Sequence, residues 1–282
     1  MAALSDPGLV VIGDSGRTAA AIGPCAPPPY PDSADHELSE CAVPGAQVRA
    51  ASVRGLMHRH KREPRQDRFS VVYDDATATL VIVVCDGVGE FALSQEAAAF
   101  VALDAPRAYL LHRDWYAAVA EVNRRLAEVA ADAPHRTRLA AVPDHGMATT
   151  LAAVAIRFTE TRRLASIAWA GDTSVWFLEK GGWESLTDEK PGGDPDAPDS
   201  GRVQALPAAT AQPAVAEREL LDGALFVTTD GIGNPLRDAG QVREALAGWW
   251  ATPPDVFTFA RQVGFARKSH LDDRTAVGVW LA

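Results

Sequence analysis

The stretch LVIVVCDGVG, residues 80–89, decides the fold class. Its six consecutive apolar side chains are typical of a short strand that is covered on both faces. The run ends abruptly at Asp86-Gly87, a pair of turn residues. The apolar segment 97–103 follows, and Ser94 precedes it in the position of a helix cap. This part of the chain therefore predicts a buried strand, an acidic turn and a helix.

Strand and helix patterns continue on both sides of this stretch. Residues 69–73 alternate as on a half-buried strand, and apolar side chains recur every three or four residues from Trp115 to Val129, as on a long amphipathic helix. Further strands are predicted at 149–158, 164–170, 174–178, 183–186, 224–229 and 275–281, and helices at about 238–250 and 254–267. Short turns such as 179–182 imply antiparallel pairing. The pattern predicts an α+β fold in which antiparallel sheets are flanked by helices.

The first 45 residues differ from the rest in composition. They hold seven of the 19 prolines, and their only Lys or Arg is Arg17. We expect residues 1–45 to be a flexible extension in which only 9–13 resembles a strand, and residues 46–282 to form one domain. Inside that domain, residues 189–215 form a Pro-, Gly- and Asp-rich insertion that is too polar and broken for an element of its own.

The charge balance limits the partners. The 282 residues include 27 Lys and Arg and 37 Asp and Glu, a formal charge of −10. An acidic surface argues against nucleic acid and anionic membranes, because both attract basic surfaces. The three cysteines, Cys25, Cys41 and Cys85, form no metal-binding motif and fit a reducing cytoplasm. With no visible export signal or membrane-spanning run, the chain is expected to be a cytoplasmic globular protein.

Four aspartates lie at the ends of predicted strands: Asp86, Asp172, Asp230 and Asp272. Carboxylates that converge repel one another unless a cation neutralises them, so convergence would create a metal site. Oxygen ligands without His or Cys nearby favour Mg²⁺ or Mn²⁺ over Zn²⁺. An Asp-Gly pair is also ordinary turn chemistry. However, Asp86 and Asp230 follow strongly apolar strands, where a charge is costly unless it is solvated or bound.

Six short motifs, taken in order, resemble those of the 2C-type metal-dependent protein phosphatases, the PPM family. The match spans residues 46–282, and the start SVRGLMH, residues 52–58, is similar to that of a bacterial subset. The motifs are REPRQD (62–67), CDGVG (85–89), GMATTL (146–151), GDTS (171–174), TDGI (229–232) and DDRT (272–275). The resemblance implies two antiparallel β-sheets packed as a sandwich and flanked by helices, in α-β-β-α order.

The resemblance also implies a centre of two Mg²⁺ or Mn²⁺ ions. Asp86 would bridge both ions, Asp230 and Asp272 would complete the ligands of the first, and the Gly87 carbonyl would bind the second. Asp172 matches the ligand of a third, weaker ion. With Asp86 and Asp230 as catalytic residues, a hydroxide that bridges the ions would attack the phosphate in line, without a covalent phosphoenzyme.

The REPRQD segment would supply the remaining groups. Asp67 matches an acidic position at the second metal site, where contact is partly through water, and Gln66 replaces the glutamate of many relatives. Arg62 would bind the substrate phosphate and stabilise charge in the transition state. Arg65 is an alternative for this task, and either arginine could be a solvated surface residue.

A proton donor for the leaving oxygen is less clearly marked. Some relatives carry a histidine two residues after the bridging aspartate, where this chain has Val88. His58 and His60 are near Arg62 in sequence and could donate this proton, but we interpret both as surface or packing residues. His145 is interpreted as a loop residue.

The sequence thus predicts a cytoplasmic phosphatase of phosphoserine and phosphothreonine in proteins, acting on the products of a Ser/Thr kinase. Two alternatives stay open. One is a catalytically weak regulatory or scaffold module, suggested by Gln66, Val88 and the insertion 189–215. The other is a hydrolase of small phosphorylated metabolites that uses the same metal centre.

Overall fold

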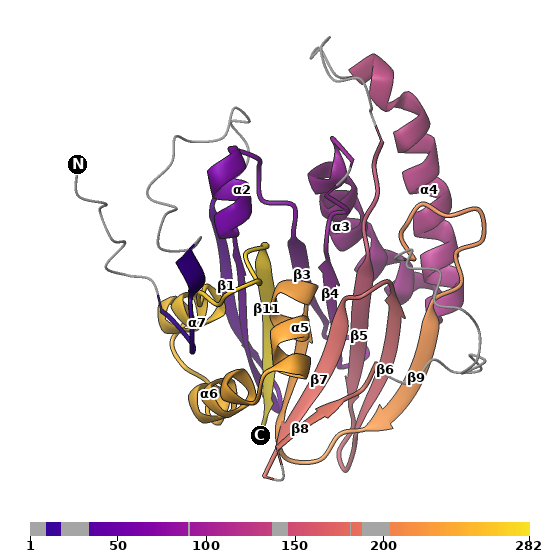
Figure 1. Ribbon diagram of the computed structural model, residues 1–282. Coiled ribbons are helices and arrows are strands. Elements are labelled where there is room, and N and C mark those ends of the chain that lie inside the picture. Colours follow the sequence, from indigo (N-terminus) through magenta and orange to yellow (C-terminus); the bar gives the residue numbers. More distant parts are fainter. Residues whose placement is uncertain (1–9, 18–33, 90, 137–145, 181, 188–203) are drawn as a thin grey trace, which may run out of the picture.

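The computed structural model describes residues 10–17, 34–89, 91–136, 146–180, 182–187 and 204–282. They form two antiparallel β-sheets that face each other (Figure 1). The first sheet has the order β1 (His36–Val43), β2 (Ala46–Val53), β11 (Arg274–Leu281), β10 (Ala224–Thr228), β7 (Ser174–Glu179) and β8 (Gly182–Ser185). The second has the order β3 (Arg68–Asp74), β4 (Thr79–Cys85), β5 (Leu151–Phe158), β6 (Arg163–Ala170) and β9 (Ala214–Glu219).

Helices cover the outer face of each sheet (Figure 1). The long helices α3 (Ser94–His112) and α4 (Trp115–Arg136) pack over the five-stranded sheet. The shorter helices α5 (Asp230–Asp238), α6 (Gly240–Trp250) and α7 (Val256–Val263) pack over the six-stranded sheet, and α2 (Leu56–Lys61) lies beyond the end of β2. The predicted α-β-β-α sandwich is confirmed. None of the helices in the described ranges is long and apolar enough to cross a membrane.

The alternation of side chains along β4 explains its continuous apolar sequence. Leu80, Ile82 and Val84 point into the core between the two sheets. Val81, Val83 and Cys85 point to the opposite face, where α3 and α4 cover them. All six residues are fully buried. A strand inside this layered fold has no solvent face, which is why its sequence lacks the usual polar alternation.

Several elements differ from the sequence-based expectations, and β2, α2 and α5 were not among the predicted strands and helices. The predicted extension 1–45 is wrong for residues 36–43, because β1 pairs with β2 along its whole length and forms an edge of the sheet. Within the expected strand 9–13, Val11 forms a single bridge to Ala266. The insertion 189–215 contains the first two residues of β9, a strand that is half-buried at 214–216 and exposed at 217–219. Residues 188–203 and His145 lie outside the described ranges.

The predicted helix cap at Ser94 is also wrong. The cap position of α3 is Leu93, and no side chain caps the helix there. Ser94 is the first helical residue, and it is fully buried. A Cβ atom on Gly87 would lie 2.9 Å from the Ser94 carbonyl carbon and oxygen. Ser94 therefore packs against the acidic turn, and its buried hydroxyl makes no capping hydrogen bond to the first turn of α3.

Candidate metal centre

The topology places the predicted acidic residues at one end of the sandwich. Asp86 directly follows β4, and Asp67 directly precedes β3, its antiparallel neighbour. In the other sheet, Asp230 follows β10 after one residue, and Asp272 comes two residues before β11, again an antiparallel neighbour. Asp172 lies in the connection from β6 to β7. Since adjacent antiparallel strands begin and end at the same edge, these five side chains come from both sheets to one place.

Threonines of the GMATTL motif fix the backbone of Asp86. The Thr149 hydroxyl and the Thr150 amide both donate to the Asp86 carbonyl at 2.8 Å. The Asp86 amide donates to the Thr150 hydroxyl at 3.3 Å. Neighbouring Gly87 forms a bridge with Thr149. The motif therefore holds the acidic turn rigidly against the start of β5.

Burial and mutual repulsion raise the pKa values of these carboxyls. The pKa of Asp86 lies well above its usual value, first because of burial and then because of the charges of Asp67, Asp230, Asp272 and Asp172. Burial also raises the pKa of Asp230, to about 6, and the charges of Asp272 and Asp172 add to this. The contributions of the neighbouring charges require short distances between the carboxyls. The predicted acidic residues thus form one electrostatic cluster.

Two oxygen atoms of the cluster fit a bound cation. Asp67 Oδ2 accepts hydrogen bonds from the hydroxyls of Thr229 and Thr275, both at 2.8 Å. Asp67 Oδ1 and Asp230 Oδ1 are buried and have no hydrogen-bond partner among the described residues. A buried carboxylate oxygen without a partner is costly, and a divalent cation is a ligand that would remove this cost. The donor set fits Mg²⁺ or Mn²⁺, which take oxygen ligands.

Two glycines enclose the backbone of Asp272 and Asp273. A Cβ atom on Gly55 would lie 2.2 Å from the Asp272 carbonyl carbon, and one on Gly231 would lie 2.0 Å from the Asp273 carbonyl oxygen. No side chain fits at either position without a shift of the backbone. The glycine after Asp230 therefore serves close packing against the segment that carries Asp272.

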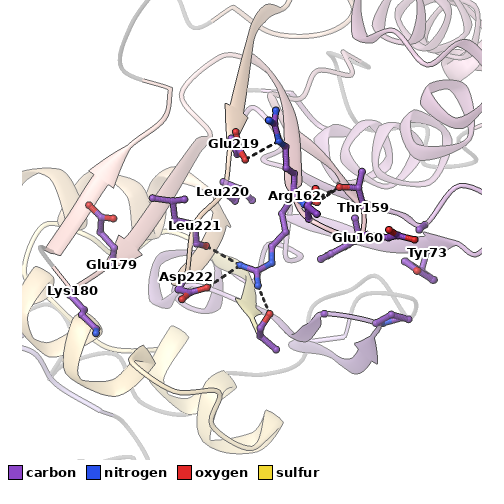
Figure 2. Close-up of a pocket in the computed structure, with 17 residues that line it drawn as sticks. Tyr73, Thr159, Glu160, Arg162, Glu179, Lys180, Glu219, Leu220, Leu221 and Asp222 are labelled. Atoms are coloured by element: carbon purple, nitrogen blue, oxygen red, sulfur yellow. Dashed lines mark hydrogen bonds and ion pairs between the residues drawn. The ribbon is translucent and has the colours of Figure 1, made fainter.

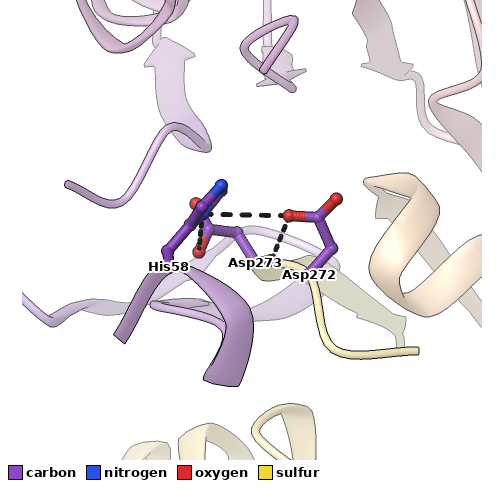
Figure 3. Close-up of side chains that lie close together, drawn as sticks. All are labelled: His58, Asp272 and Asp273. Carbon is purple, nitrogen blue, oxygen red and sulfur yellow. Dashed lines mark hydrogen bonds and ion pairs between the residues drawn. The ribbon is translucent and has the colours of Figure 1, made fainter. Parts of the chain in front are cut away.

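Asp273 connects three parts of the site, a role that the sequence does not reveal. Its Oδ1 accepts from the Gly55 amide and its Oδ2 from the Gln66 amide, both at 2.6 Å. The same carboxylate lies 2.9 Å from His58 Nδ1, an ion-pair distance without hydrogen-bond alignment (Figure 3). Asp273 is almost fully buried. One carboxylate thus joins the start of α2, the segment before Asp67 and the segment before β11.

His58, which we interpret from the sequence as a surface or packing residue, is buried beside two of the carboxylates. Its Nδ1 is 3.8 Å from Asp272 Oδ1 (Figure 3). His58, Asp272 and Asp273 offer potential ligand atoms that all lie within 4.8 Å of one another. Burial lowers the pKa of His58, but the contact with Asp273 and the charges of Asp273, Asp272 and Glu63 outweigh this and raise it to about 9. His58 is therefore a buried cation beside the acidic cluster.

The cluster opens to solvent through a cleft of about 520 Å³. The cleft lies between α2, the start of α5 and the loop before β11. Its lining includes Met57, His58, Lys61, Glu63, Gly89, Asp230, Gly231, Asn234, Ser269, His270, Leu271 and Asp272. Lys61 and His58 place positive charge beside the acidic residues.

The two candidate phosphate-binding arginines occupy different environments. Arg65 is buried, pairs with Glu37 of β1 at 2.6 Å and donates to the Ser52 carbonyl at 3.1 Å. It therefore ties the segment before β3 to the edge of the other sheet and does not face a substrate. Arg62 is exposed at the end of α2, in a left-handed conformation with φ of 62°. It stands between Lys61 and Glu63, which line the cleft, but it is not itself part of the lining.

Replacement of Arg65 by alanine is expected to destabilise the protein. Removing one partner of a fully buried ion pair typically costs about 3–5 kcal/mol, and we expect about 2–3 kcal/mol here because Glu37 can be solvated. Urea unfolding of Arg65→Ala and Arg62→Ala measures the difference. The exposed Arg62 side chain should change stability by no more than about 0.5 kcal/mol. Equal stability of the two variants would contradict a structural role for Arg65.

A larger cavity, about 950 Å³, lies at the opposite end of the strands (Figure 2). Turns between strands of both sheets line it, including residues 158–163 and 219–222. Its arginines are paired with acids: Arg162 Nε lies 3.7 Å from Glu219, and Arg163 lies 3.2 Å from Asp222. This cavity contains none of the clustered aspartates and is not part of the candidate centre.

Comparisons with known proteins show what this chain is similar to. The family model described as protein phosphatase 2C matches residues 54–262. A comparison of the sequence with curated proteins finds no match.

Solved structures share the fold at low identity. A serine/threonine phosphatase of S. agalactiae is 17% identical, with a TM-score of 0.60, and the match covers 88% of this chain and 100% of that one. Serine/threonine phosphatase Stp1 of Staphylococcus aureus is 14% identical, with a TM-score of 0.61 and coverage of 83% and 94%. The serine/threonine phosphatase PstP/Ppp of Mycobacterium tuberculosis is 19% identical, with a TM-score of 0.55 and coverage of 84% and 99%.

Proposed function

Because the chain belongs to the protein phosphatase 2C family, we propose that it is a metal-dependent phosphatase that hydrolyses phosphoserine and phosphothreonine in proteins. The convergence of five aspartates from both sheets, two of them with buried oxygens that lack a hydrogen-bond partner within the described part of the chain, is the observation that carries this proposal. Such a cluster is unfavourable on its own and becomes favourable when cations occupy it.

We expect the chain to hold two Mg²⁺ or Mn²⁺ ions. Asp86, at the centre of the electrostatic cluster, would contact both. Asp230 and Asp272 would hold one ion, and the Gly87 carbonyl, with Asp67 close by, would serve the other. Asp172 would hold a third, weaker ion. When bound, such ions activate a water molecule at neutral pH and neutralise the phosphoryl oxygens.

The remaining residues would position these ligands and the substrate. Thr149 and Thr150 fix the Asp86 backbone, and Asp273 fixes the loops on both sides of the cleft. Arg62 would reach the substrate phosphate from the end of α2, beside Lys61 at the rim. A cation at this position would attract the dianionic phosphate into a protein whose net charge is −10.

The shape of the cleft suggests the class of substrate, and the cysteines suggest the cellular location. The open cleft suits a phosphorylated side chain on a protein surface, the product of a Ser/Thr kinase. The described cysteines, Cys41 and Cys85, are unpaired, which suits a reducing cytoplasm of a bacterial cell. Retention of all the clustered aspartates argues against a scaffold without catalysis.

Removal of the metal tests the proposal. The protein should hydrolyse a phosphothreonine peptide and p-nitrophenyl phosphate in Mn²⁺ or Mg²⁺, and EDTA should reduce both rates to background. Restoring excess Mn²⁺ should restore both. Hydrolysis that persists in EDTA would contradict a metal-dependent reaction, and binding of the phosphopeptide without turnover in any metal would favour the scaffold alternative.

A further inference from the structure

A second hollow adjoins the candidate metal centre. Its volume is about 660 Å³, and its lining consists of Asp14, Ser15, Gly16, Arg17, Lys268, Ser269 and Leu271. Ser269 and Leu271 also line the cleft of the metal centre. The two hollows therefore lie side by side and share one wall.

The N-terminal part of this lining is docked on the domain, beside α7 (Figure 1). The Ile12 amide donates to the Ala266 carbonyl at 3.2 Å, and the Ala266 amide donates to the Val10 carbonyl at 2.6 Å. The Lys268 amide donates to the Asp14 carbonyl at 2.8 Å, and Ile12 is buried in the core beneath α5–α7. The segment 10–17 is thus built into the surface next to the cleft.

The shared wall is held from both sides. The Leu271 carbonyl accepts from the Met57 amide of α2 at 2.9 Å, and the His270 amide donates to the Arg267 carbonyl at 3.2 Å. Ser269 adopts a left-handed conformation with φ of 66°, which is uncommon for a residue other than glycine. A constrained wall of this kind keeps the second hollow at a fixed position relative to the metal centre.

The charge of the second hollow is opposite to that of the protein. Arg17 and Lys268 line it, and its only acidic residue is Asp14. Lys268 Nζ lies 3.9 Å from Asp14 Oδ2, but these side chains are 67% and 73% exposed, so the pair is weak and its partners can be exchanged. A basic hollow on a protein of net charge −10 is suited to an anionic group.

We propose that this hollow is a substrate subsite that binds an acidic side chain near the phosphorylated residue. The proposal rests on the phosphatase function proposed above and adds a preference among protein substrates. An extended peptide advances about 3.3 Å per residue, so a carboxylate a few residues from the phosphate can cross the shared wall. The docked N-terminal segment supplies Arg17 and supports Lys268, and it is thereby a part of substrate recognition.

Phosphopeptides that differ only beside the phosphothreonine test this subsite. We would compare peptides that carry three glutamates or three lysines on the N-terminal side, and a second pair with these residues on the C-terminal side. The wild type should favour the glutamate peptide of at least one pair by about tenfold in kcat/KM, which corresponds to about 1.4 kcal/mol. The double variant Arg17→Glu/Lys268→Glu should lose or reverse this ratio. Because both peptides are assayed on the same enzyme, the ratio does not depend on the fraction of folded protein.

The variant Arg162→Glu/Lys180→Glu is the matched control. It makes the same change in net charge at the opposite end of the strands, and it should keep the wild-type ratio. The proposal is overturned if the wild type shows no preference, if Arg17→Glu/Lys268→Glu keeps it, or if the control loses it equally. Absence of any p-nitrophenyl phosphate hydrolysis would instead refute the proposed function.

Discussion

Replacement of Asp86 by asparagine is expected to abolish phosphatase activity and, at the same time, to stabilise the metal-free protein. The charges of all four other clustered aspartates raise the pKa of Asp86. Its loss should remove metal binding and reduce kcat/KM on the order of 10³-fold or more, the upper range for one electrostatic contact. In the metal-free protein the same change removes a buried carboxyl whose ionisation is disfavoured by burial and by four neighbouring carboxylates, which should add about 1–2 kcal/mol to the free energy of unfolding.

The repulsion within the metal-free cluster should also make the stability of the protein depend on pH. The pKa of Asp230 is raised from 3.8 to about 6, so between these values the folded protein binds more protons than the unfolded chain. Stability therefore falls as the pH rises through this window. His58, raised from 6.5 to about 9, continues the fall at higher pH because its stabilising charge is lost there. Metal-free wild type should be less stable at pH 8 than at pH 5.

Thermal unfolding from pH 5 to pH 8, with and without Mn²⁺, measures these changes. Saturating Mn²⁺ should raise the wild-type Tm most at high pH, where the carboxylates are ionised. Asp86→Asn should show a flatter pH profile and little response to Mn²⁺. The variant Asp75→Asn, on the exposed turn between β3 and β4, should behave as wild type. Full activity of Asp86→Asn, or an unchanged response to Mn²⁺, would contradict the assigned centre.

Replacement of Asp273 by alanine is expected to have the largest effect on stability. It leaves the amides of Gly55 and Gln66 buried without their acceptor, and it leaves His58 without its ion-pair partner. Hydrogen bonds to a charged group are each worth about 1.5–3 kcal/mol. Relief of repulsion between Asp273 and Asp67 offsets part of this loss. We expect a net destabilisation of about 2–4 kcal/mol, measured by urea unfolding.

The conservative variant Asp273→Asn separates the role of Asp273 as a hydrogen-bond acceptor from the role of its negative charge. Asp273→Asn keeps one acceptor oxygen but turns an amide group toward an N–H donor, so it should recover only part of the stability. Activity should fall in both variants because Asp273 positions the segments that carry Asp67 and Asp272. If Asp273→Ala is as stable as the exposed-turn variant Asp75→Asn, then the connections through this carboxylate do not hold the site together.

The sequence predicted the strands and helices that have a clear pattern of apolar residues. The run 80–85 is short, rich in Val and Ile and followed by an Asp-Gly turn pair, which favours a strand covered on both faces, and the spacing from Trp115 to Val129 indicates an amphipathic helix. Strand β1 was missed because it is an edge strand beside a Pro-rich segment, with a largely polar and exposed sequence. Strand β9 was missed for the same reason. Edge strands bury only part of their surface, so their sequences carry a weak signal.

The candidate site was predictable where a residue ends a buried strand. Asp86 and Asp230 each follow an apolar run, where a charged side chain is costly to bury. Their position is therefore recognisable in the sequence. Asp273 and His58 carry no such mark, because their importance lies in contacts across 200 or more residues of chain. The difference between Arg62 and Arg65 depends on Glu37, a residue in the segment expected to be flexible. Only the pairing of β1 with β2 reveals that contact.

The most direct test of the central claim is a crystal structure with Mn²⁺, in which anomalous scattering locates the ions. We predict two peaks about 3.5–4 Å apart, with the Asp86 carboxylate between them and with Asp230 and Asp272 on one ion. A single peak at His58, Asp272 and Asp273, with none at Asp86, would contradict the account.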